Sequence, residues 1–355
     1  MTTKKPQVEV SVISCTRNRA RQLATLFQCL GSQRDLEDIR WEIVIVDNNS
    51  TDNTKEVAYA FCEGSNLRVN YVFEPNTGLS YARNSGILAS KGSLLLFIDD
   101  DVLIPPEFIS NALFGVKEFP EFGIFGFRVL PEWRDGTKAP FWLSFKKSFN
   151  LPVNLIQSFL PVHDLGPEPL QYPNRITKNP IGASFLIKKE VFEKLGPFRE
   201  DLGAGQSGVC EDTEYFWYAM MNDFKILYWP YAALYHTVDP RRLSVGYLHK
   251  WYFNLGKSLY LIKSNGRIHK ENNGENAELK SSNPEFEKLT HALNTQHLLL
   301  SNKIFKIPIF LIFKLLIIIL LLPTSILLLF INKPFYLSTM LAKTLGEIKQ
   351  AVNIK

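Results

Sequence analysis

One short stretch limits the fold of this chain more than any other. Residues 94–102 read Leu-Leu-Leu-Phe-Ile-Asp-Asp-Asp-Val, an apolar run that ends in three aspartates. A run this short, with Gly92 before it and Pro105 and Pro106 after it, is typical of a strand buried on both faces of a parallel sheet. We therefore expect the carboxylates at the carboxyl end of a central strand, the edge where open α/β sheets bind ligands.

Three adjacent carboxylates, Asp99, Asp100 and Asp101, repel one another unless a positive charge lies among them. A hard divalent cation is the usual partner, because it prefers carboxylate oxygens as ligands. The alternative is a solvated turn in which one aspartate caps the helix that begins near Pro106. The buried strand in front of the aspartates favours the metal, since a surface turn does not need such an anchor.

The rest of the amino-terminal half repeats the order of strand, polar loop and helix. Apolar runs at residues 8–14, 41–46 and 67–74 are each followed by polar residues and then by a helical pattern. This alternation predicts an α/β fold with a mostly parallel central sheet flanked by helices. Singly, the polar residues could be helix caps or Asx turns. Together they are expected along one rim: Arg17, Arg19, Asp47, Arg83, Asp99, Asp100 and Asp101.

Four motifs give the sequence a family resemblance: Ser-Val-Ile-Ser-Cys-Thr-Arg-Asn-Arg, Glu-Ile-Val-Ile-Val-Asp-Asn-Asn-Ser-Thr-Asp, Asn-Thr-Gly-Leu-Ser-Tyr-Ala-Arg-Asn-Ser-Gly and Phe-Ile-Asp-Asp-Asp-Val. In this order they resemble the family 2 glycosyltransferases, inverting enzymes with the GT-A nucleotide-sugar fold. The resemblance covers residues 8–238. It implies that Asp47 accepts a hydrogen bond from the nucleotide base, that Thr16 and Arg17 shape the same pocket, and that Arg83 lies close to the nucleotide.

The same resemblance assigns the aspartates and a later histidine. Asp99 and Asp101 correspond to the outer members of an Asp-x-Asp motif that binds manganese or magnesium, with Asp101 the more direct ligand. Asp100 would face the ribose or sugar of the donor. His236 ends an apolar run and could be a buried structural residue, but neutral imidazole is a common metal ligand. The resemblance implies that His236 is a further ligand to the metal.

Glu211 and Asp212 begin an apolar helix, and acidic residues in a first turn are favoured there by the helix dipole alone. Beside the four motifs, however, the pair resembles the family's Glu-Asp motif. In that motif Asp212 would be the general base, because an acceptor hydroxyl must lose its proton as it attacks the sugar. Glu211 would orient or bind the acceptor.

Composition narrows the possible partners. Lys and Arg number 40 against 35 Asp and Glu, and the small excess is not gathered into a basic stripe, so we expect no nucleic-acid partner. The four cysteines lack the paired spacing of zinc or redox motifs, and the polar amino terminus lacks the apolar core of a signal peptide. These features fit a reduced compartment and a catalytic domain that faces the cytoplasm.

The composition changes sharply toward the carboxyl end. Residues 1–262 are predicted to be the catalytic domain, and residues 263–303 a polar linker with a short helix. Residues 304–355 are predicted to be a membrane segment, at 304–332, followed by a basic tail. The apolar run exceeds the roughly 20 residues that a spanning helix needs, and soluble helices are seldom apolar on every face. Basic residues flank both ends, so a single span and a hairpin at Pro323 are both open, with the hairpin slightly preferred.

The sequence thus predicts a membrane-associated inverting glycosyltransferase. It would move a sugar from a nucleotide-diphosphate donor to a hydroxyl of a saccharide or lipid-linked acceptor, in surface polysaccharide or glycolipid synthesis. A nucleotidyltransferase on a related sheet is one alternative, but it does not account for Glu211 and Asp212. The other is a non-catalytic nucleotide-sugar-binding scaffold. The donor, the acceptor and the oligomeric state are left open.

Overall fold

The computed structural model describes residues 8–133, 160, 162–172, 179–265, 303–304, 307–308, 341–347 and 349–350. The chain divides into two compact units. The first comprises Met1–Glu200 and Glu211–Asp239, and the second comprises Asp201–Cys210 and Pro240–Lys355.

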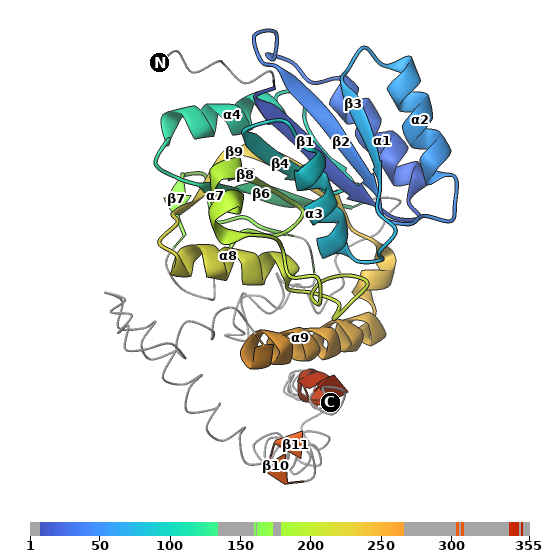
Figure 1. The fold of residues 1–355 in the computed structure, drawn as a ribbon, viewed down its shortest axis with the longest axis vertical. Coiled ribbons are helices and arrows are strands. Elements are labelled where there is room, and N and C mark those ends of the chain that lie inside the picture. Colours follow the sequence, from blue (N-terminus) through green and yellow to red (C-terminus); the bar gives the residue numbers. More distant parts are fainter. Residues whose placement is uncertain are drawn as a thin grey trace. The chain divides into compact units, whose positions relative to one another are not determined.

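The first unit is built on one mixed sheet. Its strands lie in the spatial order β3-β2-β1-β4-β8-β6-β9-β5, and β7 pairs with β9 (Figure 1). The strand bounds are β1 Val10–Thr16, β2 Trp41–Asp47, β3 Val69–Phe73, β4 Leu94–Ile98, β5 Val102–Leu103, β6 Ile124–Glu132, β7 Leu170–Gln171, β8 Ser184–Lys188 and β9 Ile226–Thr237.

The sheet is mostly parallel, as predicted: β8, β5 and β7 run against the other strands. Strands β3, β2, β1 and β4 are parallel, as expected. Beyond β4 the sheet is mixed, because β8 runs antiparallel to both β4 and β6, whereas β6 and β9 are parallel. The apolar run of β4 shows only that both faces are covered, and a strand covered on both faces can have a neighbour of either direction.

Helices cover both faces of the sheet, and alternate residues of each strand point to opposite faces. Helices α1 (Ala20–Gly31), α2 (Thr54–Gly64) and α4 (Phe108–Glu118) share one buried cluster with Ile43 and Ile45 of β2. The residues between and after them, Val44 and Val46, join the opposite cluster. That cluster packs against α3 (Leu79–Ala89), α7 (Lys189–Leu195) and α8 (Glu211–Met221) (Figure 1). The result is a sheet between two helical layers.

The second unit contains η2 (Pro240–Leu243), α9 (Val245–Asn265), the short antiparallel pair β10 (Lys303–Ile304) and β11 (Ile307–Pro308), and helical residues at 341–347 and 349–350. The last helix packs closely on α9 through two glycines. A Cβ at Gly256 would collide with the carbonyl of Lys343, and one at Gly346 with the carbonyl of Phe253.

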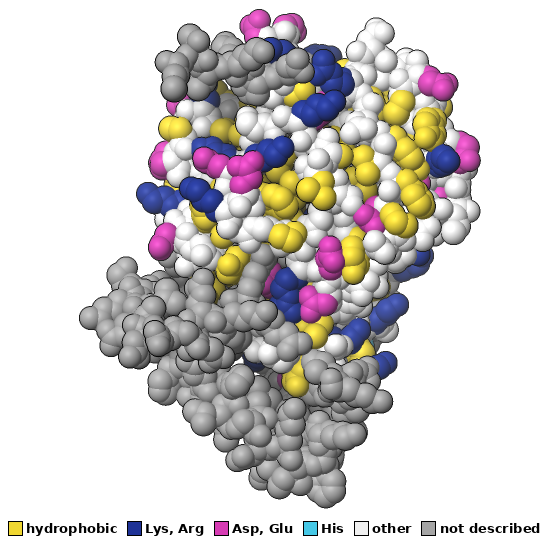
Figure 2. All heavy atoms as spheres, viewed as in Figure 1, with side chains coloured by type: hydrophobic (Ala, Val, Ile, Leu, Met, Phe, Trp, Pro, Cys, Tyr) yellow, Lys and Arg dark blue, Asp and Glu magenta, His cyan; other side chains and the backbone are white. Residues whose placement is uncertain are grey.

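Within the part of the chain that the structure describes, no helix combines the length and the apolar character needed to cross a membrane. The predicted membrane segment at 304–332 lies outside the described residues except at Ile304, Ile307 and Pro308. Residues 266–302 of the predicted linker lie outside them as well. The face drawn in Figure 2 carries Lys and Arg side chains interspersed with acidic and hydrophobic ones.

Candidate active site

The first polar group of the site stands where β1 and β2 end side by side. Thr16 and Asp47 are paired in register and close these strands. The Asp47 carboxylate is held from two directions: the Ser50 amide donates to Oδ1 (2.9 Å) and the Tyr71 hydroxyl donates to Oδ2 (2.8 Å). Burial, together with Asp47, raises the pKa of Tyr71. Arg17 is exposed on the adjoining loop. Asp47 thus closes the turn after β2 through the amide three residues on, and this bond fixes the direction of its carboxylate.

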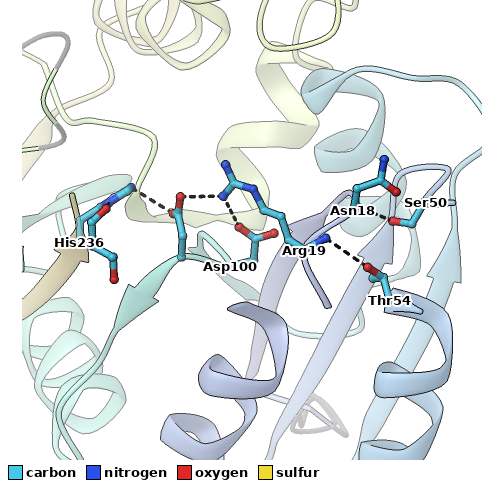
Figure 3. A network of polar contacts seen from close by, with 8 residues as sticks. Asn18, Arg19, Ser50, Thr54, Asp100 and His236 are labelled. Atoms are coloured by element: carbon cyan, nitrogen blue, oxygen red, sulfur yellow. Dashed lines mark hydrogen bonds and ion pairs between the residues drawn. The ribbon is translucent and has the colours of Figure 1, made fainter. Parts of the chain in front are cut away.

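The loops after β1 and β2 are tied to each other (Figure 3). The Asn18 amide donates to Ser50 Oγ (2.9 Å), and Asn18 Oδ1 accepts from the Thr51 amide (2.7 Å). Asn18 has φ 53, a left-handed conformation that asparagine tolerates. The next amide, that of Arg19, donates to Thr54 Oγ1 (3.2 Å). These bonds anchor the backbone of Arg19 at the sheet edge.

The three aspartates follow β4 as predicted, and the guanidinium of Arg19 lies beside two of them. Arg19 Nη1 is 2.7 Å from Asp100 Oδ1 and 2.6 Å from Asp101 Oδ2 (Figure 3). Burial raises the pKa of Asp99 to about 7. The charge of Arg83 opposes this rise, and that of Asp101 adds to it. Burial likewise raises the pKa of Asp100 to about 6, against the opposing effect of Arg19. Burial thus disfavours the charged forms of Asp99 and Asp100, and an added positive charge would offset this effect.

His236 reaches this cluster through strand pairing. Strands β5 and β9 are antiparallel, with Val102 opposite His236, and the Thr237 amide donates to the Asp101 carbonyl (3.2 Å). His236 Nε2 consequently lies 3.1 Å from Asp101 Oδ1. Ligand atoms of Asp99, Asp101 and His236 all lie within 4.8 Å of one another.

The donor set of these three residues fits a divalent cation. His236 Nδ1 is 3.0 Å from the Thr237 carbonyl, which can only accept, so Nδ1 carries a proton. Nε2 then faces Asp101 Oδ1 at 3.1 Å, and a proton or a divalent cation between the two atoms would satisfy both. A ligating histidine that donates its other N–H to a carbonyl is the usual arrangement in metal sites. Asp99, Asp101 and His236 would therefore hold the metal.

Arg83 lies inside the protein, where it binds Glu211. Its side chain is only 2% exposed, and Nη1 is 2.9 Å from Glu211 Oε1. Nη2 donates to the Gly182 carbonyl (3.3 Å), and the guanidinium lies over the rings of Phe185 and Phe198. Burial raises the pKa of Glu211, an effect that the neighbouring Asp212 reinforces and Arg83 opposes. Arg83 therefore fixes the start of α8.

Gly182 and Ala183 connect the metal cluster to the Glu-Asp pair. The Asp99 amide donates to the Ala183 carbonyl (3.0 Å). A Cβ built on Gly182 would lie 2.7 Å from Arg83 Nη2 and 2.8 Å from Asp212 Oδ2. Asp212 Oδ1 is held by Thr213, whose amide donates at 2.6 Å. Asp99 and Asp212 are thus both neighbours of the segment Gly182–Ala183.

The sequence did not point to Tyr71 or Gly182, nor to the contacts that Arg19 makes. Tyr71 belongs to a strand and gives no local sign that its hydroxyl meets Asp47. Gly182 matters only because two side chains from distant elements converge on it. Arg19 was expected on the rim, but its contact with two aspartates depends on a separation of more than 80 residues along the chain.

Residues 11–196, just over half of the 355 in the chain, match the model of Glycosyl transferase family 2. The chain belongs to glycosyl transferase family 2. The matched region includes Asp47, Arg83 and the three aspartates. Glu211, Asp212 and His236 lie beyond it, and the roles of all these residues stay predictions.

Curated members of the family share parts of this sequence. The validoxylamine A glucosyltransferase of Streptomyces hygroscopicus subsp. jinggangensis is 36% identical over 107 residues, which are 29% of this chain and 24% of that enzyme. The chain thus spans about a quarter of the length of that relative. The succinoglycan biosynthesis protein ExoM of Rhizobium meliloti is 24% identical over 251 residues, 71% of this chain and 74% of that protein.

Among solved structures, the mannosyltransferase PcManGT from Pyrobaculum calidifontis, in complex with GDP-Man and Mn2+, superposes with a TM-score of 0.58. The two are 20% identical, and the match covers 99% of this chain and 89% of that one. This likeness confirms the GT-A fold that the family resemblance implied.

Proposed function

We propose that this family 2 protein is a metal-dependent inverting glycosyltransferase that uses a nucleotide-diphosphate sugar as donor. One observation carries the proposal: Asp99, Asp101 and His236 converge, and Asp99 bonds Ala183, next to Gly182, which lies close to Asp212. A cation site and a carboxylate base next to each other are what sugar transfer from a diphosphate requires. PcManGT, which shares the fold, was solved with GDP-Man and Mn2+, and this supports the same class of donor.

The chemistry follows from the positions of the side chains. The acceptor hydroxyl oxygen attacks the anomeric carbon, the bond from that carbon to the phosphate oxygen breaks, and its electron pair leaves with the nucleoside diphosphate. Asp212 takes the hydroxyl proton. A divalent cation held by Asp99, Asp101 and His236 would stabilise the charge that develops on the leaving diphosphate. Attack from the face opposite the diphosphate inverts the anomeric centre.

Arg83 keeps the base in place without taking part in proton transfer. Its guanidinium neutralises Glu211, and Gly182 lies between the same guanidinium and Asp212. Thr213 holds Asp212 Oδ1, while Oδ2 faces Gly182. The base is thus positioned by neighbours that are themselves fixed. Such positioning matters, because small displacements of a catalytic group reduce rates strongly.

The acceptor class and the location belong to the same proposal. The similarity to ExoM, a succinoglycan biosynthesis protein, supports a saccharide or lipid-linked acceptor in surface polysaccharide synthesis. The apolar residues 304–332 support attachment to a membrane, with the catalytic domain in the cytoplasm. A reporter fused after Lys355 tests the arrangement: an extracytoplasmic reporter excludes the hairpin, and a cytoplasmic one excludes the single span.

A panel of nucleotide sugars, each with Mn2+ or Mg2+, tests the activity. We expect metal-dependent release of a nucleoside diphosphate from at least one donor, and its loss in Asp212→Asn without loss of donor binding. Release of pyrophosphate from a sugar phosphate and a nucleotide would instead identify a nucleotidyltransferase. Donor binding without turnover across the panel and a set of saccharide acceptors would favour a scaffold.

A further inference from the structure

Arg19 supplies positive charge to the acidic cluster. Its Nη1 bonds Asp100 Oδ1 and Asp101 Oδ2 at 2.7 and 2.6 Å. Hydrogen bonds between an ionised donor and an ionised acceptor are stronger than neutral ones. In this structure the guanidinium therefore occupies a place beside Asp101 that favours a cation.

Both oxygens of Asp101 are engaged by protein groups. Oδ2 meets Arg19, and Oδ1 meets His236 at 3.1 Å. His236 can share a metal with Asp101, because both offer ligand atoms within the same 4.8 Å group. Arg19 cannot, since a guanidinium only donates and carries the same sign of charge as the metal. A divalent cation bound by Asp101 therefore repels Arg19.

The side chain of Arg19 is able to leave. It is 39% exposed, whereas that of Asp100 is 5% exposed and that of Asp101 is 15% exposed. The Arg19 backbone is held by Thr54, so leaving Asp101 needs only rotation about side-chain bonds (Figure 3). The fixed backbone also keeps the released guanidinium close to any anion that the cation binds.

We propose that Arg19 stands in for the divalent cation before loading and transfers to the donor's diphosphate once the cation binds, which couples the two binding steps. The inference rests on the proposed function, because it takes the cation site and the diphosphate donor from it. The planar guanidinium suits phosphate oxygens, to which it can donate two parallel hydrogen bonds. The same residue thus opposes cation binding in the free protein and supports donor binding in the loaded one.

The first test measures the binding of Mn2+ alone to the full-length protein by calorimetry and by the loss of the free Mn2+ EPR signal. Arg19→Met removes the competing charge, so we expect Mn2+ to bind about tenfold more tightly than to the wild type. Arg19→Lys keeps the charge and should stay close to the wild type. Arg21→Met is the matched control: it removes an exposed arginine two residues away and should leave the affinity unchanged.

The second test measures the affinities of UDP and GDP at saturating Mn2+. For whichever nucleotide binds the wild type, Arg19→Met should weaken binding about tenfold, although the cation itself binds better. If Arg19 moves from Asp101 to the diphosphate, Arg19→Met should strengthen Mn2+ binding and weaken nucleotide binding. A residue with a purely structural role would weaken both.

Asp101→Ala distinguishes a failure of the inference about Arg19 from a failure of the proposed function. If this variant loses Mn2+ binding while Arg19→Met binds Mn2+ no more tightly than the wild type, the inference about Arg19 is overturned and the cation site stands. If Asp101→Ala binds Mn2+ as the wild type does, the proposed function itself fails.

Discussion

Breaking the buried pair of Arg83 and Glu211 should destabilise the protein in a way that depends on pH. Their side chains are 2% and 8% exposed, and Nη1 and Oε1 are 2.9 Å apart. Arg83→Met keeps most of the apolar volume but leaves the Glu211 carboxylate without its cation. Removing one partner of a buried ion pair costs about 3–5 kcal/mol, because the remaining charge is uncompensated.

The pH dependence follows from the direction of the Glu211 shift. Burial already raises the pKa of Glu211 above its ordinary value, and Arg83 opposes this rise. Without Arg83 the folded-state pKa rises further above that of the unfolded chain, so stability is lost as pH increases above the unfolded value. Each pH unit between the two pKa values costs about 1.4 kcal/mol. The loss should therefore be small near the unfolded-state pKa of Glu211 and grow as pH rises above it.

Urea unfolding followed by circular dichroism measures this effect. With a slope of about 2–3 kcal/mol per molar urea, a loss of about 3–5 kcal/mol lowers the midpoint by roughly 1–2 M. Arg40→Met is the matched control, because Arg40 pairs with Glu9 at 3.7 Å on the surface, with side chains 49% and 37% exposed. An exposed pair of this kind contributes at most about 1 kcal/mol.

The double variant Arg83→Met with Glu211→Gln removes both charges and should recover part of the stability at pH 8. Its midpoint should also vary less with pH than that of Arg83→Met. The reasoning is refuted if Arg83→Met unfolds within 0.3 M urea of the wild type at pH 8, or if its midpoint does not depend on pH.

Three further predictions concern the base, the metal and the nucleotide pocket. Gly182→Ala places a methyl group 2.7 Å from Arg83 Nη2 and 2.8 Å from Asp212 Oδ2, so kcat should fall about 100-fold while Mn2+ affinity is retained. Gly31→Ala, where nothing lies within 4 Å, is the control, and equal activity of the two variants would contradict the assignment. Because burial raises the pKa of Asp99 to about 7, Mn2+ affinity should increase as pH rises from 5 to 7 and then level off. The metal-free protein should lose stability over the same range, since a raised folded-state pKa disfavours the charged form; affinity independent of pH would contradict this. Tyr71→Phe removes the donor to Asp47 Oδ2 and should weaken nucleotide binding about fivefold with kcat unchanged, as calorimetry can show. Tyr59→Phe, on a neighbouring exposed ring, should have no such effect, and equal affinities in the two variants would count against the role of Tyr71.

The sequence was most informative where chemistry follows directly from local order. Apolar runs that end in polar residues located the carboxyl ends of β1, β2 and β4, and with them Thr16, Asp47 and Asp99. The start of α8 at Glu211 was equally clear, since acidic residues precede an apolar helix. Local patterns suffice for such features because each depends on a few adjacent residues.

Features that depend on distant pairing could not be found in this way. The antiparallel course of β8 is not encoded in its apolar residues, which would suit either direction. His236 meets Asp101 only because β5 and β9 pair, and Arg83 meets Glu211 across 128 positions of the chain. The predicted place of Arg83 close to the nucleotide stays a prediction, and the pairing of its guanidinium with Glu211 was not anticipated. Such partners are set by the tertiary fold.

The most direct test of the account is to locate the cation. Crystals grown with Mn2+ and the nucleoside diphosphate of the active donor should show an anomalous peak within about 2.5 Å of an Asp101 oxygen and of His236 Nε2. The account also predicts diphosphate oxygens on the same ion. A Mn2+ peak bound elsewhere, with Arg19 still on Asp101 and the nucleotide in place, would contradict it.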